Sequence, residues 1–225
     1  MTFSLAARCP ETGQFGIAIS SSSPAVAARC AHVRAGVGAV ASQNVTDPRL
    51  GPQALRLLAE GARAAEAVAI LARTAPHPEF RQLLVVDGQG GAAIHSGPRA
   101  LGVWAEATGP CVAAGGNLLA DAGVPAAMVA AFGAASGHLG ARLMAALAAG
   151  LAAGGEAGPV RSAGLVIADA QDWPLVDLRV DWTEGCPITE LATLWTLWQP
   201  QMQDYVTRAL DPTAAPSFGV PGDQG

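Results

Sequence analysis

The chain contains no lysine, because all thirteen basic residues among its 225 residues are arginines. P-loop proteins hold phosphates with a lysine, and pyridoxal and other Schiff-base enzymes need a lysine amine. The absence of lysine therefore excludes these classes. The formal net charge is −5 and aromatic residues make up 5 % of the chain, with no basic stripe between aromatic side chains. This composition argues against nucleic acid as a partner.

Cysteine is scarce and widely spaced, without a CxxC pair: the four residues are Cys9, Cys30, Cys111 and Cys186. This pattern indicates reduced, mostly buried thiols in a cytoplasmic protein. The histidines lack ligand-like spacing, so the sequence predicts no metal and no cofactor. No signal-peptide pattern opens the chain, and the alanine-rich stretch at residues 144–153 is too short to span a membrane. We therefore expect a cytoplasmic protein without a membrane partner.

Small side chains dominate the composition, and only 14 % of the residues are charged. A monomer with so few charges would leave a mildly apolar surface, which favours a homo-oligomer. The length suits one large domain, which we expect over residues 1–210. The remaining residues, 211–225, are rich in proline and glycine and have little to bury, so they predict an extended or disordered tail.

Short apolar runs follow one another across turns and predict three β-hairpins, at residues 2–8 with 14–20, 81–87 with 92–96, and 162–169 with 175–181. Further strands are expected at residues 36–43 and 111–114. Helical patterns cover residues 51–60, 64–73, 125–132, 136–153 and 187–210. Since neighbouring strands form hairpins, the sheets are mainly antiparallel. The order predicts an α+β fold: a four-layer αββα sandwich of two stacked sheets flanked by helices.

Thr2 follows the initiator methionine directly and begins the first predicted strand. If Met1 is removed, the freed α-amine of Thr2 lies on the same residue as the hydroxyl, and its reference pKa of about 7.7 lets it act as a base. A hydroxyl with such a base becomes a nucleophile. Thr2 is therefore a candidate catalytic residue. The alternative is an ordinary strand threonine.

Gly115, Gly116 and Asn117 come directly after a predicted strand. The glycine amides and the Asn117 side chain can bind an oxyanion or line a substrate pocket. The alternative is a tight turn from strand to helix, with Asn117 as the helix cap.

Four further polar residues are candidates for substrate binding: Ser20, Arg34, Gln43 and Arg81. Arginine binds a carboxylate through two hydrogen bonds, and polar side chains at strand ends commonly form sites on sheets. The alternative is polar turns and solvated surface charge.

Seven segments of the chain resemble those of a known family and follow one another in the same order as in that family. They are MTFSLAAR with PETGQFGIAIS, RAGVGAVASQ, GPQALRLLAEG, RQLLVVD, GGNLLA, RLMAALAAGLAAGGE and SAGLVIAD. Together they resemble a family of uncharacterised bacterial proteins described as similar to the N-terminal-nucleophile (Ntn) hydrolases. The resemblance implies an αββα sandwich, amide hydrolysis and Thr2 as nucleophile. The polar positions that match the family are Thr2, Arg34, Gln43, Arg81, Gln82, Asp87, Asn117, Glu156 and Ser162.

Two positions depart from the family pattern. Arg161 stands where the pattern has a glutamine, and residues 20–23 are richer in serine. Either change can alter a pocket.

Three functions remain open from the sequence. The first is an Ntn-type hydrolase cleaving an amide, non-peptide C–N bond of a small metabolite. The second is a non-catalytic binding or assembly protein with the same sandwich. The third is a hydrolase that uses Cys9 or Cys30 with His32, which the sequence supports least because neither cysteine lies in an activating pattern.

Overall fold

Strand β1 (Thr2–Arg8) lies in the middle of the molecule, and its side chains alternate between two separate parts of the core. Phe3, Leu5 and Ala7 pack in the cluster that contacts helices, whereas Ala6 belongs to a second cluster. Successive residues of a strand point to opposite faces of its sheet. Both faces of β1 are therefore buried. The computed structural model describes residues 2–221, so Met1 and residues 222–225 lie outside the described part.

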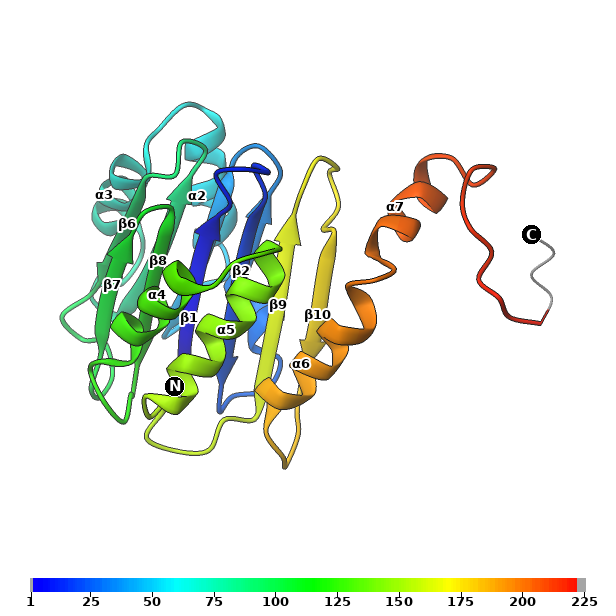
Figure 1. Ribbon diagram of the computed structural model, residues 1–225. Helices are drawn as coiled ribbons and strands as arrows, with labels where there is room; N and C mark the ends of the chain where they lie inside the picture. Colours follow the sequence, from blue (N-terminus) through cyan, green and yellow to red (C-terminus); the bar gives the residue numbers. More distant parts are fainter. Residues whose placement is uncertain (1, 222–225) are drawn as a thin grey trace.

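Two antiparallel sheets are stacked on each other (Figure 1). The six-stranded sheet runs in the order β10 (Val176–Val180), β9 (Ser162–Ala168), β2 (Phe15–Ser21), β1, β8 (Val112–Asn117) and β7 (Ala105–Gly109). The four-stranded sheet runs in the order β3 (Ala31–Arg34), β4 (Gly38–Asn44), β5 (Arg81–Asp87) and β6 (Ala92–Ser96). Between the two sheets lies a cluster of small and branched side chains that includes Ala6, Ile17, Ala41 and Leu84.

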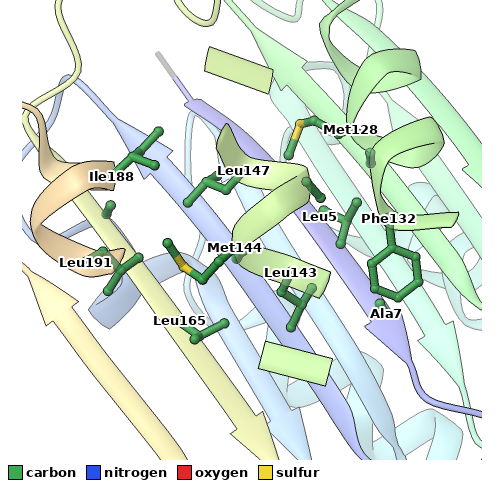
Figure 2. Packing of buried hydrophobic residues seen from close by; sticks show 14 of the residues in the cluster. Leu5, Ala7, Met128, Phe132, Leu143, Met144, Leu147, Leu165, Ile188 and Leu191 are labelled. Atoms are coloured by element: carbon green, nitrogen blue, oxygen red, sulfur yellow. The ribbon is translucent and has the colours of Figure 1, made fainter. Parts of the chain in front are cut away.

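Helices cover the outer face of each sheet. The six-stranded sheet carries α4 (Val124–Ala134), α5 (Leu139–Ala152) and α6 (Pro187–Trp198), and the four-stranded sheet carries α2 (Leu50–Ala59) and α3 (Ala64–Thr74). Figure 2 shows Leu143, Met144 and Leu147 of α5 pointing toward the sheet between Leu5 and Leu165. The sequence prediction of a four-layer αββα sandwich is thus confirmed.

Several boundaries differ from the sequence prediction. Helix α1 (Val26–Cys30) and strands β3 and β7 were not predicted, since they are short and carry no clear periodicity. The strand expected at residues 111–114 continues through Asn117 as β8. A short 3-10 turn, η1 (Pro78–Phe80), precedes β5.

The single helix expected at residues 187–210 is wrong, because α6 ends at Trp198 and a separate helix, α7 (Met202–Leu210), follows. Pro200 lies between them and has no N–H to continue the helix. Helix α7 projects away from the sheets, and residues 211–221 after it contain no helix or strand (Figure 1).

Candidate functional site

Thr2 lies between the two sheets at one end of the sandwich. It pairs with Asn117 of β8, and its side chain shares a face with Ser4. The Ser4 hydroxyl donates to Gln43 Oε1 of the other sheet at 2.6 Å, so this face is the one between the sheets. Thr2 is 5 % exposed. Its hydroxyl donates to Ser21 Oγ of β2 at 3.3 Å.

A row of hydroxyl groups continues from Ser21. The hydroxyl oxygens of Ser21 and Ser23 lie 2.8 Å apart, and the Ser23 N–H donates to Ser21 Oγ at 3.1 Å. The Arg29 guanidinium then donates to Ser23 Oγ at 3.1 Å. A cation at the far end withdraws electron density from the hydroxyls before it. The row Thr2, Ser21, Ser23, Arg29 therefore links the Thr2 hydroxyl to a cation through hydrogen bonds.

Three buried amide side chains lie on the other side of Thr2. Gln43 Nε2 donates to Gln82 Oε1 at 2.8 Å, and Asn117 Nδ2 donates to the same oxygen at 3.2 Å. Both glutamines also donate to main-chain carbonyls of β8, those of Gly115 and Gly116. These bonds connect the two sheets directly, so they hold Asn117 in a defined position.

Asn117 Oδ1 is a buried acceptor without a hydrogen bond to any residue in the described part of the chain. Gln82 Oε1 already accepts from the Asn117 nitrogen, which sets the direction of the amide. Directly paired residues on one face of a sheet have side chains about 5 Å apart. The free oxygen of Asn117 and its second N–H can therefore reach a ligand bound beside the Thr2 side chain.

Glu156 reaches this end of the sandwich from the loop after α5. Both of its carboxyl oxygens accept the Ser22 N–H, at 3.0 and 3.1 Å, and its backbone forms an isolated bridge with Leu119. The loop turns sharply at Gly154 and Gly155, whose φ angles are +118° and +58°. Burial raises the pKa of the Glu156 carboxyl to about 7, although the Ser22 hydrogen bonds oppose the shift.

The structure places three of the candidate residues, Thr2, Gln43 and Asn117, at the same end of the sandwich. Ser20 lies one residue from Ser21 but faces the helical layer, where its hydroxyl donates to the Ser162 carbonyl at 3.0 Å. Its neighbour Ser21, rather than Ser20, contacts Thr2. A one-residue step along a strand reverses the side-chain direction, and the sequence SSSS does not show which serine faces which side.

The turn expected at Gly115 and Gly116 is wrong, because both residues lie inside β8 with strands on either side. Their N–H groups point along the sheet toward β1 or β7, so they are not turned toward Thr2. The helix-cap alternative for Asn117 is also wrong, since α4 begins only at Val124.

The two arginines predicted to bind substrate lie in different places. Arg34 pairs with Gly38 at the opposite end of β4 from Gln43, so the structure does not bring it to Thr2. Arg81 lies at the Thr2 end, beside Gln82. Its guanidinium donates to the main-chain carbonyls of Val45 and Pro76.

Glu156 and Arg29 were not found as site residues from the local sequence pattern. The family resemblance marked Gln82 and Glu156 as matching positions, but nothing in the sequence singled out Arg29. These residues come from separate segments, and only their packing joins them.

The geometry does not support Cys30 as the nucleophile of the cysteine alternative. Cys30 is buried, and burial raises the pKa of its thiol, which disfavours the reactive thiolate. Cys30 Sγ lies 3.5 Å from Thr46 Oγ1. Burial also lowers the pKa of His32.

Within residues 2–221, no group of three or more His, Cys, Asp or Glu side chains is arranged to hold a metal ion. In the same part of the chain, the longest apolar helices fall short of the length that a membrane span requires.

The architecture and the site together define an αββα sandwich with a hydroxyl residue at the second position, between its two sheets. The chain belongs to the DUF1028 family, a family of unknown function, whose model matches residues 2–191. This confirms the resemblance to a bacterial family.

A crystal structure of a DUF1028 protein from Silicibacter pomeroyi is 30 % identical to the chain, with a TM-score of 0.83 over 92 % of this chain and 93 % of that one. Anbu (ancestral beta-subunit) from Yersinia bercovieri is 12 % identical, with a TM-score of 0.40 over 90 % of this chain and 97 % of that one. No curated protein matches the chain.

Proposed function

We propose that the protein is an Ntn-type hydrolase that cleaves an amide, non-peptide C–N bond of a small metabolite. Thr2 is the nucleophile, and its α-amine is the base once Met1 has been removed. The observation that supports this most directly is the position of the Thr2 hydroxyl, which lies between the Ser21 hydroxyl and the Asn117 amide at the end of two stacked sheets.

In the proposed reaction, Thr2 Oγ1 attacks the substrate carbonyl carbon while the α-amine takes the hydroxyl proton, directly or through water. The second N–H of Asn117 stabilises the oxyanion that forms. The C–N bond then breaks, the leaving nitrogen takes the proton from the ammonium group, and an ester with Thr2 remains. A water molecule hydrolyses this ester and restores the hydroxyl.

Three other side chains support the reaction. Ser21 positions the Thr2 hydroxyl, and Asn117 Oδ1 is an acceptor suited to an N–H of the α-amine or of the substrate. Arg81, the first residue of β5 at this end of the sandwich, binds a substrate carboxylate through its guanidinium. The two glycines of β8 are not part of this mechanism.

The experiment compares four forms of the protein on a broad panel of small amides. The forms are the chain beginning at Thr2, the chain that keeps Met1, Thr2→Ala and Thr2→Ser. We expect full hydrolysis from the chain beginning at Thr2 and none from the chain that keeps Met1. We expect about a 10³-fold loss in Thr2→Ala, and partial activity in Thr2→Ser because it retains a hydroxyl. Equal hydrolysis by Thr2→Ala would show that Thr2 is not the nucleophile.

One observation favours a second candidate, a non-catalytic binding or assembly protein. Thr2 is only 5 % exposed and its hydroxyl already has a partner in Ser21, as expected of a residue that only joins strands. The two candidates differ in the mass of the protein purified from cells. Retained Met1 would favour the non-catalytic candidate, because the Thr2 nitrogen is then part of a peptide bond and cannot act as a base.

A further inference from the structure

An apolar recess lies at the end of β4 and β5. It encloses about 330 Å³ and is lined by Val45, His77, Phe80 and Arg81. Small-molecule sites commonly start at about this volume and combine apolar walls with a few polar groups. Val45 is 42 % exposed, so its side chain is accessible to a ligand.

The recess opens at the same end of the sandwich as Thr2. Val45 is two residues after Gln43, and Phe80 is two residues before Gln82. These two glutamines contact Ser4 and Asn117 between the sheets. Gln43 and Gln82 therefore connect the strands that form the recess to the polar residues around Thr2.

Hydrogen bonds hold the walls of the recess in place. Asn44 has a φ angle of +73°; its Nδ2 donates to the Phe80 carbonyl at 2.5 Å, and its Oδ1 accepts the Leu101 N–H at 3.2 Å. A Cβ at Gly97 would lie 2.3 Å from the Glu79 carbonyl oxygen, so the chain after β6 packs directly on η1. The recess is thus formed before a ligand binds, which lowers the entropy lost on binding.

Positive charge surrounds the apolar floor. Arg81 lines the recess, and the Arg99 guanidinium lies 5.3 Å from the centre of the Phe80 ring. The negative group here is Glu79, whose carboxylate lies 3.8 Å from His77 Nδ1. The other nearby carboxylate, Asp47, is neutralised by its 2.7 Å ion pair with Arg49.

We propose that this recess binds the part of the substrate that carries both an apolar group and a carboxylate. The substrate class is then the N-acyl derivatives of amino acids with apolar side chains. The apolar group contacts Val45 and Phe80, and the carboxylate lies against Arg81 and Arg99, while the amide carbonyl extends toward Thr2. This assignment rests on the proposed hydrolase function, and the experiment below separates the two.

Three small probes test the recess without any reaction: 3-phenylpropanoate, its uncharged amide 3-phenylpropanamide, and propanoate, which lacks the ring. Their binding to the full chain is followed by NMR titration. We expect 3-phenylpropanoate to bind at least about fivefold more tightly than either of the others, because it alone offers both an apolar group and a charge. The resonances of Val45 and Phe80 should shift on binding.

Val45→Asp places a carboxylate in the apolar wall, and Val220→Asp is the matched control, since Val220 is 57 % exposed on the chain after α7. We expect Val45→Asp to weaken 3-phenylpropanoate binding by about tenfold or more and Val220→Asp to leave it unchanged. Equal affinity in the two variants, equal affinity for the uncharged amide, or no binding to the unaltered chain would overturn the proposal.

Hydrolysis by the chain beginning at Thr2 distinguishes the two proposals. If probes bind the recess but no amide is cleaved, the recess assignment stands as a binding site and the hydrolase function fails. If amides are cleaved, we expect KM for N-acetylphenylalanine to be lower than for N-acetylglycine, and Val45→Asp to remove this difference in KM. Cleavage with no such preference would overturn the recess assignment alone.

Discussion

The hydroxyl groups of Thr2 and Ser21 lie 3.3 Å apart on neighbouring strands of one sheet. This contact exists because β1 and β2 pair with Phe3 opposite Ser20, which places Ser21 beside Thr2 on the face between the sheets. Ser20 and Ser21 are adjacent in the sequence, yet only Ser21 contacts the candidate nucleophile. Substitutions at Ser20 and Ser21 therefore provide a matched test of whether the Ser21 hydroxyl supports the action of Thr2.

Ser21→Ala removes the hydroxyl that orients Thr2. We expect kcat of the chain beginning at Thr2 to fall about tenfold with KM little changed, because the loss concerns the nucleophile and not substrate binding. Ser20→Ala removes a buried hydroxyl on the opposite face, so it should cost about 1 kcal/mol of stability without changing kcat. Ser21→Thr should restore most of the rate. Equal loss of activity in the two alanine variants would show that the Ser21 hydroxyl does not orient Thr2.

Glu156→Gln should change how stability depends on pH. Burial raises the folded-state pKa of Glu156 to about 7 from an ordinary value near 4.5. Between these two values the unfolded chain loses the proton while the folded protein keeps it, so the free energy of unfolding falls as pH rises and levels off above pH 7. The wild type should lose up to about 3 kcal/mol relative to Glu156→Gln over this interval.

Urea unfolding of both proteins at several pH values measures this difference. Contributions from groups that do not interact with Glu156 cancel when one curve is subtracted from the other. A difference that stays constant from pH 4.5 to pH 7.5 would show that the Glu156 carboxyl ionises normally in the folded protein.

Gln43→Leu should destabilise the protein strongly. The Gln43 amide accepts from Ser4 and donates to Gln82 and to the Gly115 carbonyl, all buried between the sheets. Leucine removes all three hydrogen bonds and leaves the buried Ser4 hydroxyl without its acceptor, so we expect a loss of about 3 kcal/mol. Chemical denaturation measures it, with Gln53→Leu on the exposed face of α2 as control, which should change stability by less than about 0.5 kcal/mol. A similar small change in both variants would contradict the role of the amides.

Two glycines in neighbouring helices should respond to alanine in opposite directions. At Gly140 of α5 an added Cβ would lie 2.5 Å from the Trp195 ring of α6, whereas at Gly133 of α4 nothing lies within 4 Å. Gly140→Ala should lower the free energy of unfolding by about 1 to 3 kcal/mol through overpacking. Gly133→Ala should raise it by about 0.5 to 1 kcal/mol, because alanine favours a helix. Thermal unfolding of both variants shows the signs, and stabilisation by Gly140→Ala would contradict the packing of α5 against α6.

The break between α6 and α7 shows that the spacing of apolar residues alone does not predict where a helix ends. Apolar residues continue through residues 187–210 at helical spacing, which predicts a single helix, but Pro200 cannot donate the hydrogen bond that a continuous helix needs. The signal for the break was present in the sequence. The short elements α1, β3 and β7 gave no comparable signal, because their few residues carry no clear alternation and their positions depend on the sheets beside them.

The sequence by itself determined the hairpins and the layers. Because it contains no lysine, it also excluded the classes of protein whose chemistry needs a lysine side chain. Those features follow from local patterns: alternation along a strand, turn residues between strands, and residues that are absent. Only the tertiary structure decided which polar residues meet. Ser22 and Glu156 are 134 positions apart yet joined by hydrogen bonds, and Asn117 contacts Gln82 across the two sheets. Arg34, close to Thr2 in the sequence, lies at the far end of its strand. Strand register and sheet stacking set these distances, and both arise from packing over the whole chain.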